Sequence, residues 1–316
     1  MADQPQILVI RGGAIGDFIL TLPAIQLLRE NIPHGRLEIL GYRPVIELAQ
    51  EAGLAEGLRS LEHRNMAPLF VPQAVLSEEL IAYFRGFKLI VSYLYDPDGY
   101  LKGNMERMGV KTYLEASHRV QPGLGHAAEQ LAQPLEKLAF FLDDPAPHLK
   151  LSPSPEVTQP TIAFHPGSGS LRKNWSLQRW TEFFRQVMPA HSGIQVAVIT
   201  GEAEAERGIT EALRREWAEA PYSWTLWDQL PLTELAHRLT ACRAFLGHDS
   251  GISHLAAACD VPCLLLFGPT DPAIWAPRNA GVQVVTAPQG NLDFLPLTPV
   301  LAAGAAFLAN TLRKTA

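Results

Sequence analysis

The sequence has few cysteines, no long apolar run and no excess of positive charge. Its three cysteines, Cys242, Cys259 and Cys263, form no CxxC pair, so they indicate buried thiols in a reducing compartment rather than a disulfide framework. No apolar stretch reaches the roughly 18 residues of a membrane helix, and the first residues carry no secretory pattern. The net charge of −6 argues against a broad nucleic-acid surface. We therefore expect a cytoplasmic protein with no membrane span, and peripheral contact with the inner face of the cytoplasmic membrane stays open.

What the sequence does contain is enough apolar material for two cores. The chain has 316 residues, of which 47% are hydrophobic and 18% charged, as in globular proteins. At this length, two domains of about 150 residues are expected rather than one.

The first half begins with a βαβ pattern. Residues 6–11 form a short apolar run that ends at Gly12 and Gly13, which is typical of a buried parallel strand. Apolar residues then recur at helical spacing from Asp17 to the breaker Pro33, and a second strand follows at 36–40. A helix at 77–84 and a strand at 88–92 continue the alternation.

The same alternation restarts after a proline-rich stretch at 142–160, which we interpret as a linker. Strands are expected at 161–164, 195–199, 244–246 and 263–267, with a helix at 177–187 and an alanine-rich helix at 301–312. The pattern predicts an α/β protein with two tandem, doubly wound, Rossmann-like domains. We expect domains at 1–155 and 156–300, followed by a terminal helical segment at 301–316.

The first candidate site is the turn RGGAIGD, residues 11–17. Glycines between a strand and a helix allow close backbone approach to a ligand, here at Gly12, Gly13 and Gly16. Arg11 stands where a dinucleotide fingerprint needs its first glycine, so a nicotinamide dehydrogenase is disfavoured. Asp17 could accept a proton from an attacking hydroxyl or serve only as a helix N-cap, and spacing alone leaves both open.

The second candidate site is HPGSGSLRKNW, residues 165–175. Glycines and hydroxyls follow a strand, and Arg172 and Lys173 lie just beyond. Backbone donors with a fixed cation can offset the charge of a leaving diphosphate. An ordinary turn with a solvated basic pair is the alternative.

The third candidate site is GHDSGISH, residues 247–254, close to FGPTDP at 267–272. Asp249, Ser250, Gly251 and His254 lie at the carboxyl end of a strand, where open α/β sheets bind ligands. No G-x-S-x-G elbow surrounds Ser250, so a hydrolase is disfavoured. His254 could also be a plain core or capping histidine.

Two further features have simpler explanations. Asp96 and Asp98 have the D-x-D form of a metal site, but Asp-Pro-Asp-Gly is also a strong turn sequence, which we favour. Lys102, Arg107, Lys111 and Arg119 form a basic group. The first three could contact an anionic acceptor, although a solvated face is the default.

Together, the three motifs resemble glycosyltransferase family 9, whose best-known members are ADP-heptose:lipopolysaccharide heptosyltransferases. The similar stretches are ILVIRGGAIGDFILTLPAIQLL, HPGSGSLRKNW and LGHDSGISHLAAACDVPCLLLFGPTDPAIWAP, in this order along the chain. The resemblance implies a GT-B fold with the active site in a cleft between the domains. The acceptor would bind the N-terminal domain and the nucleotide-sugar the C-terminal one, and the last helix would cross back to the first domain.

The resemblance also implies roles for individual residues. The catalytic base falls on Asp17, and Asp249 would contact the transferred sugar. Leu230 would lie against the nucleobase. The acidic contact to the ribose falls on Glu204, with Glu202 and Glu206 as close alternatives. The phosphate contacts fall on Ser168, Lys173, Ser250, Gly251 and His254.

The expected activity is an inverting transfer that needs neither a metal nor a cofactor. A sugar, by resemblance heptose from ADP-heptose, would pass to a lipopolysaccharide core or a related anionic glycan. Gly13 and Ala14 stand where the family often has serines, which leaves a different donor sugar open. A non-catalytic nucleotide-sugar binding protein and a nucleotide-sugar epimerase are the remaining alternatives.

Overall fold

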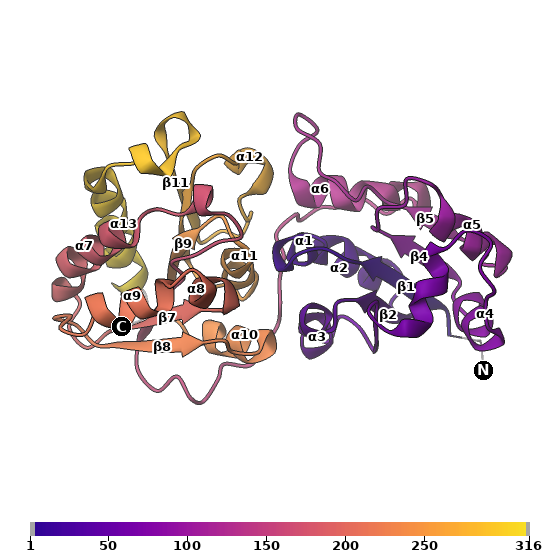
Figure 1. The fold of residues 1–316 in the computed structure, drawn as a ribbon, viewed down its shortest axis with the longest axis horizontal. Helices are drawn as coiled ribbons and strands as arrows, with labels where there is room; N and C mark the ends of the chain where they lie inside the picture. Colours follow the sequence, from indigo (N-terminus) through magenta and orange to yellow (C-terminus); the bar gives the residue numbers. More distant parts are fainter. Residues whose placement is uncertain (1–3, 314–316) are drawn as a thin grey trace. The chain divides into compact units, whose positions relative to one another are not determined.

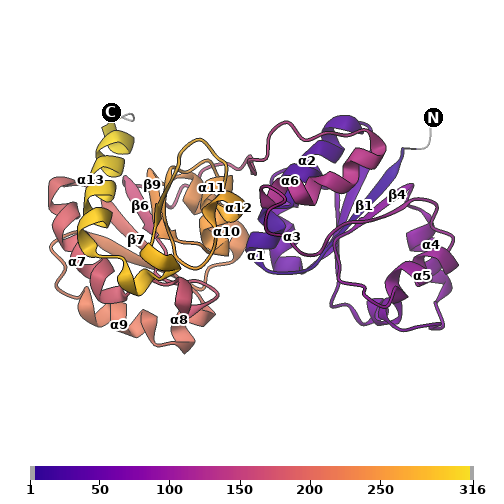
Figure 2. The same cartoon turned by 90° about the horizontal axis from the view of Figure 1, so that it is seen from above.

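The computed structural model describes residues 4–313 and divides the chain into two compact α/β units, Met1–Pro145 and Ala146–Ala316. Each unit is built on one parallel sheet with helices on both faces (Figures 1 and 2). The predicted fold class, two Rossmann-like domains of the GT-B type, is thereby confirmed.

The sheet of unit 1 has the strand order β3-β2-β1-β4-β5. Helices α2 and α3 pack on one face and α4 and α5 on the other (Figure 2). The strands are β1 (Gln6–Arg11), β2 (Arg36–Gly41), β3 (Gly57–Ser60), β4 (Leu89–Ser92) and β5 (Tyr113–Glu115). The helices are α1 (Ile15–Ile19), α2 (Leu22–Asn31), α3 (Arg43–Glu51), α4 (Glu78–Arg85), α5 (Tyr100–Arg107) and α6 (Ala127–Ala132).

The sheet of unit 2 has the order β11-β10-β9-β6-β7-β8. Its strands are β6 (Thr161–Phe164), β7 (Gln195–Thr200), β8 (Trp224–Asp228), β9 (Ala244–His248), β10 (Cys263–Phe267) and β11 (Val282–Thr286). Its helices are α7 (Leu177–Val187), α8 (Glu202–Glu206), α9 (Ile209–Glu216), α10 (Leu232–Thr240), α11 (Gly251–Ala258), α12 (Pro272–Trp275) and α13 (Leu297–Arg313).

The helix expected from Asp17 to Pro33 is in fact two helices. Helix α1 ends at Ile19, and α2 starts at Leu22 with Pro23 in its first turn. Proline has no backbone N–H, so a single helix could not have continued its hydrogen-bond ladder through this position. Asp17 therefore lies on the short helix α1, which is separate from α2, the helix that packs against the sheet.

The division between the units falls earlier than the expected boundary at residue 155. The backbone N–H of Leu149 donates to the carbonyl of Ala258 at 2.7 Å, and that of Ser154 to the carbonyl of His237 at 2.9 Å. These bonds attach the proline-rich segment to unit 2, because its extended backbone meets its hydrogen-bond requirement there.

The last helix, α13, starts at Leu297, earlier than the expected residue 301. It packs against α7 in unit 2. Phe307 and Leu308 are buried in the unit 2 core, and a Cβ added at Gly304 would lie 2.4 Å from the ring of Phe183. The close approach of α13 and α7 therefore depends on a glycine at this position.

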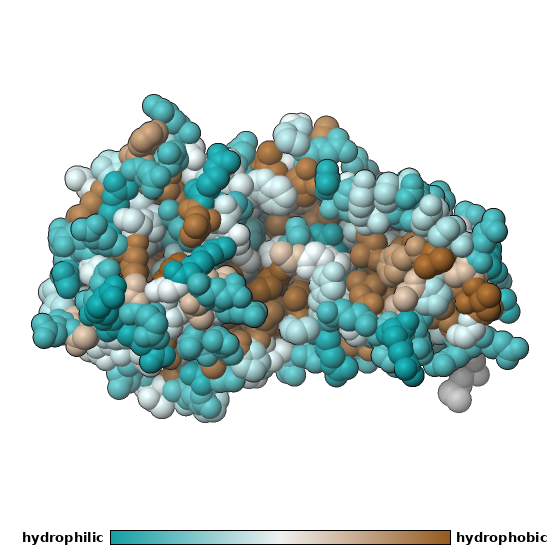
Figure 3. All heavy atoms as spheres, viewed as in Figure 1, coloured by the Kyte–Doolittle hydropathy of each residue, from teal (hydrophilic) through white to brown (hydrophobic). Residues whose placement is uncertain are grey.

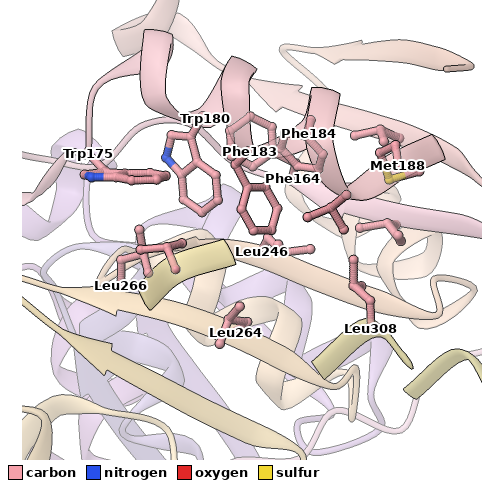
Figure 4. Packing of buried hydrophobic residues seen from close by; sticks show 14 of the residues in the cluster. Phe164, Trp175, Trp180, Phe183, Phe184, Met188, Leu246, Leu264, Leu266 and Leu308 are labelled. Carbon is pink, nitrogen blue, oxygen red and sulfur yellow. The ribbon is translucent and has the colours of Figure 1, made fainter. Parts of the chain in front are cut away.

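The unit 2 core is unusually aromatic. The ring of Phe164 is tilted against Trp180 and edge-on to Phe184, with centroids 4.9 and 4.8 Å apart (Figure 4). Trp217 stacks on Phe164 at 6.0 Å and meets Phe184 edge-on at 5.2 Å. Such geometry suits the ring quadrupoles and adds to the free energy gained from burial.

Within residues 4–313, no helix is both long and apolar enough to cross a membrane. The face drawn in Figure 3 is mostly hydrophilic, with hydrophobic residues exposed in patches.

Candidate active site

The candidate acceptor site lies where the order of unit 1 strands reverses. Strand β1 pairs with both β2 and β4, so the chain leaves β1 toward one side and returns on the other. Ligands of doubly wound sheets bind at the carboxyl ends of strands at such a switch point. A cavity of about 500 Å³ opens here, lined by Arg11, Gly12, Gly13 and Asp17 after β1 and by Tyr93, Leu94 and Tyr95 after β4.

Asp17 is the third residue of α1, and its carboxylate closes the start of that helix. Its Oδ2 accepts the backbone N–H of Ala14 at 3.0 Å. The N-cap is therefore Ala14, and Asp17 caps the helix from inside rather than from the N-cap position itself. The side chain is still 44% exposed and lines the cavity, so capping leaves it accessible to a ligand.

Arg11 is the residue that sequence reasoning missed here. Its side chain is 5% exposed, Nη2 donates to the backbone carbonyl of Asp17 at 3.1 Å, and Nη2 lies 3.8 Å from Asp17 Oδ1. The guanidinium also lies over the ring of Tyr93, 5.6 Å from its centroid. Burial lowers the pKa of Arg11, while Asp17 and Tyr93 act in the opposite direction. A buried charge at the end of a strand was a usable signal, because arginine is almost never buried without a partner.

The glycines of this turn have specific steric roles. Gly13 has a φ of +99°, and a Cβ there would lie 2.8 Å from Asp17 Oδ2. A Cβ at Gly12 would lie 3.0 Å from the side chain of Leu94, whereas Gly16 falls within α1. Gly12 and Gly13 line the cavity, so the predicted close backbone approach is sterically available at both.

The three cations suggested as acceptor contacts lie elsewhere. Lys102 pairs with Glu115 at 3.6 Å. Arg107 donates to the carbonyl of Ala74 at 2.9 Å, and Lys111 is exposed between α5 and β5. None of the three is among the residues that line the cavity. Arg107 is the last residue of α5 and Lys111 follows it. Helix α5 runs back from the carboxyl edge of the sheet, which places both residues toward the opposite edge.

The aspartates of the D-x-D sequence form a turn. The N–H of Gly99 donates to the carbonyl of Asp96 at 3.1 Å, and the Asp96 carboxylate accepts the N–H groups of Leu101 and Lys102 at 3.1 and 2.9 Å. Asp96 is thereby occupied in starting α5. No cluster of potential metal ligands occurs in the part of the chain that the structure describes.

The candidate donor site lies at the switch point of unit 2. Strand β6 pairs with β7 on one side and β9 on the other. The predicted residues follow four neighbouring strands at their carboxyl ends. Ser168 and Lys173 come after β6, Glu204 after β7, Leu230 after β8, and Asp249, Ser250, Gly251 and His254 after β9.

An ion pair occupies the centre of this site. Lys173 Nζ lies 2.7 Å from Asp249 Oδ2, and the Thr270 hydroxyl donates to the same oxygen at 2.6 Å. His254 Nε2 lies 3.8 Å from the other oxygen. Burial would raise the pKa of Asp249, but His254, Lys173 and Thr270 outweigh it and hold that pKa well below its ordinary value. Thr270 follows β10 and extends the site to a fifth strand.

Ser250 and Gly251 form the start of α11. The Ser250 hydroxyl accepts the N–H of Ser253 at 3.3 Å, which makes Ser250 the N-cap. The first backbone N–H groups of α11 therefore point toward the same edge as Lys173, and the positive end of a helix dipole favours an anion.

Ser168 and Glu204 are already engaged within the protein. The Ser168 hydroxyl bonds to the carbonyl of Ser170 and to Asn174 Oδ1, at 2.7 and 2.5 Å. Glu204 is 4% exposed, and its Oε2 accepts the N–H of Gly201 at 2.9 Å. Both side chains thus stabilise the loops that surround Lys173.

The remaining predicted contacts are easier to place. Leu230 is half-buried in the loop after β8, whereas Glu202 and Glu206 are exposed. Glu204 is the only one of the three glutamates that turns inward, where its Oε1 lies 3.7 Å from His165 Nε2. Its inward position follows from the hydrogen bond that its Oε2 accepts from the N–H of Gly201, the N-cap of α8.

Residues 103–294 match the model of glycosyltransferase family 9 (heptosyltransferase). This chain belongs to that family.

Individual relatives agree with the family 9 assignment. The chain is 29% identical over 167 residues to lipopolysaccharide heptosyltransferase 2 of Salmonella typhimurium, a stretch that covers 52% of this chain and 47% of the relative. The chain thus spans about half the length of that relative. Among solved structures, a family 9 protein from Veillonella parvula aligns over 98% of both chains with a TM-score of 0.76 and 17% identity. An E. coli heptosyltransferase solved with ADP aligns with a TM-score of 0.73 and 18% identity, over 96% of this chain and 99% of that one.

In this family 9 chain, a buried histidine connects the candidate donor site to the aromatic core. His248 Nε2 accepts the backbone N–H of Trp175 at 2.8 Å and the indole N–H of Trp180 at 3.0 Å. Accepting two hydrogen bonds requires a neutral ring with its proton on Nδ1. Burial, with a further contribution from His165, lowers the pKa of His248 to about 3.

The depressed pKa of His248 predicts an acid sensitivity of unit 2. Below about pH 6.5 the unfolded chain takes up a proton at this position that the folded chain does not take up until about pH 3. The free energy of unfolding should therefore decrease as pH falls through this window, by up to about 1.4 kcal/mol per pH unit from this one group. Urea unfolding between pH 7.5 and 4.5, followed by tryptophan fluorescence, measures it, because all six tryptophans lie in unit 2.

A matched variant isolates the contribution of this residue. His248→Gln keeps a side-chain oxygen that can accept a hydrogen bond from an N–H, and this side chain does not titrate. The unfolding of this variant should therefore take up about one proton fewer than that of the wild type, which makes its unfolding free energy less dependent on pH. His34→Gln in unit 1 is the control and should follow the wild type. Equal slopes in the wild type and His248→Gln would contradict the assignment.

Proposed function

We propose that this protein is an inverting glycosyltransferase that uses no metal and draws its sugar from a nucleotide diphosphate donor. The donor we favour is ADP-heptose and the acceptor a lipopolysaccharide core or related glycan, because the relatives are named as lipopolysaccharide heptosyltransferases and the family as heptosyltransferase. The observation that carries the proposal is the Lys173–Asp249 pair beside the N-terminus of α11.

The donor half of the reaction follows from the charges of this pair. A diphosphate that arrives at α11 meets backbone N–H groups and the Lys173 ammonium, both of which offset negative charge that grows as the nucleotide leaves. Asp249 holds Lys173 in place before the donor binds, so little reorganisation is needed. The Asp249 carboxylate can also accept a hydrogen bond from a hydroxyl of the transferred sugar.

The acceptor half depends on Asp17. Its carboxylate takes the proton of an acceptor hydroxyl as the hydroxyl oxygen attacks the anomeric carbon and the bond to the diphosphate breaks. A single displacement of this kind inverts the configuration at that carbon. A base in this position contributes roughly 10²–10⁴-fold to the rate.

Replacing the base should abolish transfer but spare the donor site. Asp17→Asn keeps an oxygen for the N–H of Ala14, so α1 should persist. We expect turnover to fall by about 10²–10⁴-fold while nucleotide affinity, measured by tryptophan fluorescence, is unchanged. Asp98→Asn removes an exposed carboxylate outside the cavity and is the control. Near-normal turnover in Asp17→Asn would sink the base assignment, and donor turnover without any acceptor would favour an epimerase.

Lys173 should contribute to donor affinity. Loss of a charge-assisted hydrogen bond of about 1.5–3 kcal/mol predicts that Lys173→Ala weakens binding of ADP by about 10–150-fold. Arg172→Ala removes the neighbouring cation and should change ADP affinity only slightly, because Lys173 rather than Arg172 pairs with Asp249. Calorimetric titration with ADP, UDP and GDP measures both variants and identifies the preferred nucleotide. Equal affinities in the wild type and Lys173→Ala would exclude a phosphate contact.

Metal independence has its own test. Lys173 and the N–H groups of α11 would offset the charge of the leaving diphosphate, so turnover should persist in excess chelator. Initial rates with and without EDTA, after extensive dialysis, measure this. A strict requirement for added Mg²⁺ or Mn²⁺ would overturn the metal-free mechanism.

A further inference from the structure

The cavity of unit 1 has aromatic walls. Tyr42, Phe70 and Tyr95 line it and remain 41%, 43% and 62% exposed, while Tyr93 is buried. The Tyr93 hydroxyl is taken up by the carbonyl of Leu131 at 2.9 Å, so the ring rather than the hydroxyl faces the pocket. Exposed aromatic faces beside a few polar groups form a surface on which the C–H face of a sugar ring can pack.

The charges that line the cavity do not add up to a site for an anion. Arg11 is the one guanidinium among the lining residues, and it already lies 3.8 Å from Asp17 Oδ1. Glu62 adds a second carboxylate, and His118 an imidazole whose ring lies 4.4 Å from that of Tyr95. A carboxylate or phosphate that entered would meet two like charges and would have to compete with Asp17 for Arg11.

Two arginines that are neighbours in sequence of lining residues, Arg43 and Arg119, do not change this balance. Arg43 follows Tyr42 but pairs with Glu47 at 2.9 Å. Arg119 lies over the ring of Tyr95, 5.9 Å from the centroid. Neither is among the residues that line the cavity.

The positive charge of Arg11 is already offset within the protein. Arg11 lines the cavity, but its Nη2 donates to the backbone carbonyl of Asp17 at 3.1 Å and lies 3.8 Å from Asp17 Oδ1. The guanidinium therefore suits an uncharged oxygen better than an anion, since Asp17 already offsets its charge.

We propose that this cavity binds a neutral sugar ring, stacked on Tyr42 and Tyr95 and hydrogen-bonded through Arg11. This inference rests on the proposed function, because it describes the acceptor of that reaction. It narrows the acceptor to a glycan whose reacting sugar carries neither a carboxylate nor a phosphate. The anionic acceptor expected from Lys102, Arg107 and Lys111 would then carry its charge on another residue of the glycan.

Three probes that share one ring test the charge preference directly. Methyl mannoside is neutral, its 6-uronate carries a carboxylate, and mannose 6-phosphate carries a phosphate. Binding of each to the full chain, with ADP present, is measured by saturation-transfer NMR and titration. We expect the neutral sugar to bind at least ten-fold more tightly than either anion. Equal or tighter binding of an anion, or no binding of any of the three, would overturn the proposal.

Variants assign the binding to this cavity. Tyr95→Ala should weaken the neutral sugar at least five-fold, whereas Tyr100→Ala removes an exposed tyrosine that does not line the cavity and should not. Glu62→Gln removes one of the two carboxylates and should reduce the difference in affinity between the neutral and the anionic probes. An unchanged gap in Glu62→Gln, or equal affinities in Tyr95→Ala and the wild type, would contradict the assignment.

The outcome can be separated from that of the proposed function. ADP binding, followed by tryptophan fluorescence, reports only on unit 2, where all six tryptophans lie. A protein that binds the neutral sugar but no nucleoside diphosphate would refute the transferase and keep the cavity assignment. A protein that transfers sugar to anionic acceptors alone would support the transferase and refute the cavity assignment.

Discussion

Both candidate sites depend on one constraint, the parallel pairing of every strand. When strands run in the same direction, all their carboxyl ends, and the turns that follow, come to one edge of the sheet. In unit 2 this edge gathers residues that are more than 100 positions apart, such as Ser168 and Thr270. In unit 1 it brings the turn after β1 to the turn after β4. Chemistry in this fold therefore needs no single contiguous motif.

The two sites are prepared for ligands in different ways. In unit 2, Lys173 and Asp249 already satisfy each other, and Ser168 and Glu204 hold the surrounding loops. A ligand there finds its contacts oriented, which reduces the entropy lost on binding. In unit 1, the walls are exposed tyrosines, which offer area rather than fixed hydrogen bonds. The first arrangement suits a small set of diphosphates, and the second suits recognition by shape.

The sequence predicted the central strands and missed the edges. The seven expected strands are those in the interior of the two sheets, whose apolar runs are buried on both faces. The four missed strands, β3, β5, β8 and β11, are all edge strands. They are half-buried and mix polar with apolar residues, as in GLRS and VQVVT, so their pattern resembles that of loops.

The same contrast holds for the sites. Motif residues such as Lys173 and Asp249 could be predicted, because they lie in the turns that follow central strands. Arg11 gave a weaker signal, a charge at the end of an apolar strand. Tyr93 could not be predicted, since its role depends on which strands are neighbours, and spacing along the chain does not reveal this. Arg107 and Lys111 were grouped by closeness in sequence, but the helix between the two edges of the sheet removes them from the cavity.

The contact between Gly167 and Glu204 has a consequence for how this chain can vary. A Cβ at residue 167 would lie 1.8 Å from Glu204 Oε1, so no other residue fits there while the glutamate keeps its position. Glu204 in turn is held by Gly201 and faces His165. A residue in the loop after β6 and a residue of α8 thus share one small volume, so a change at one position constrains the other. In related sequences, we expect a side chain at position 167 only where position 204 has become shorter, so that the two positions evolve as a pair.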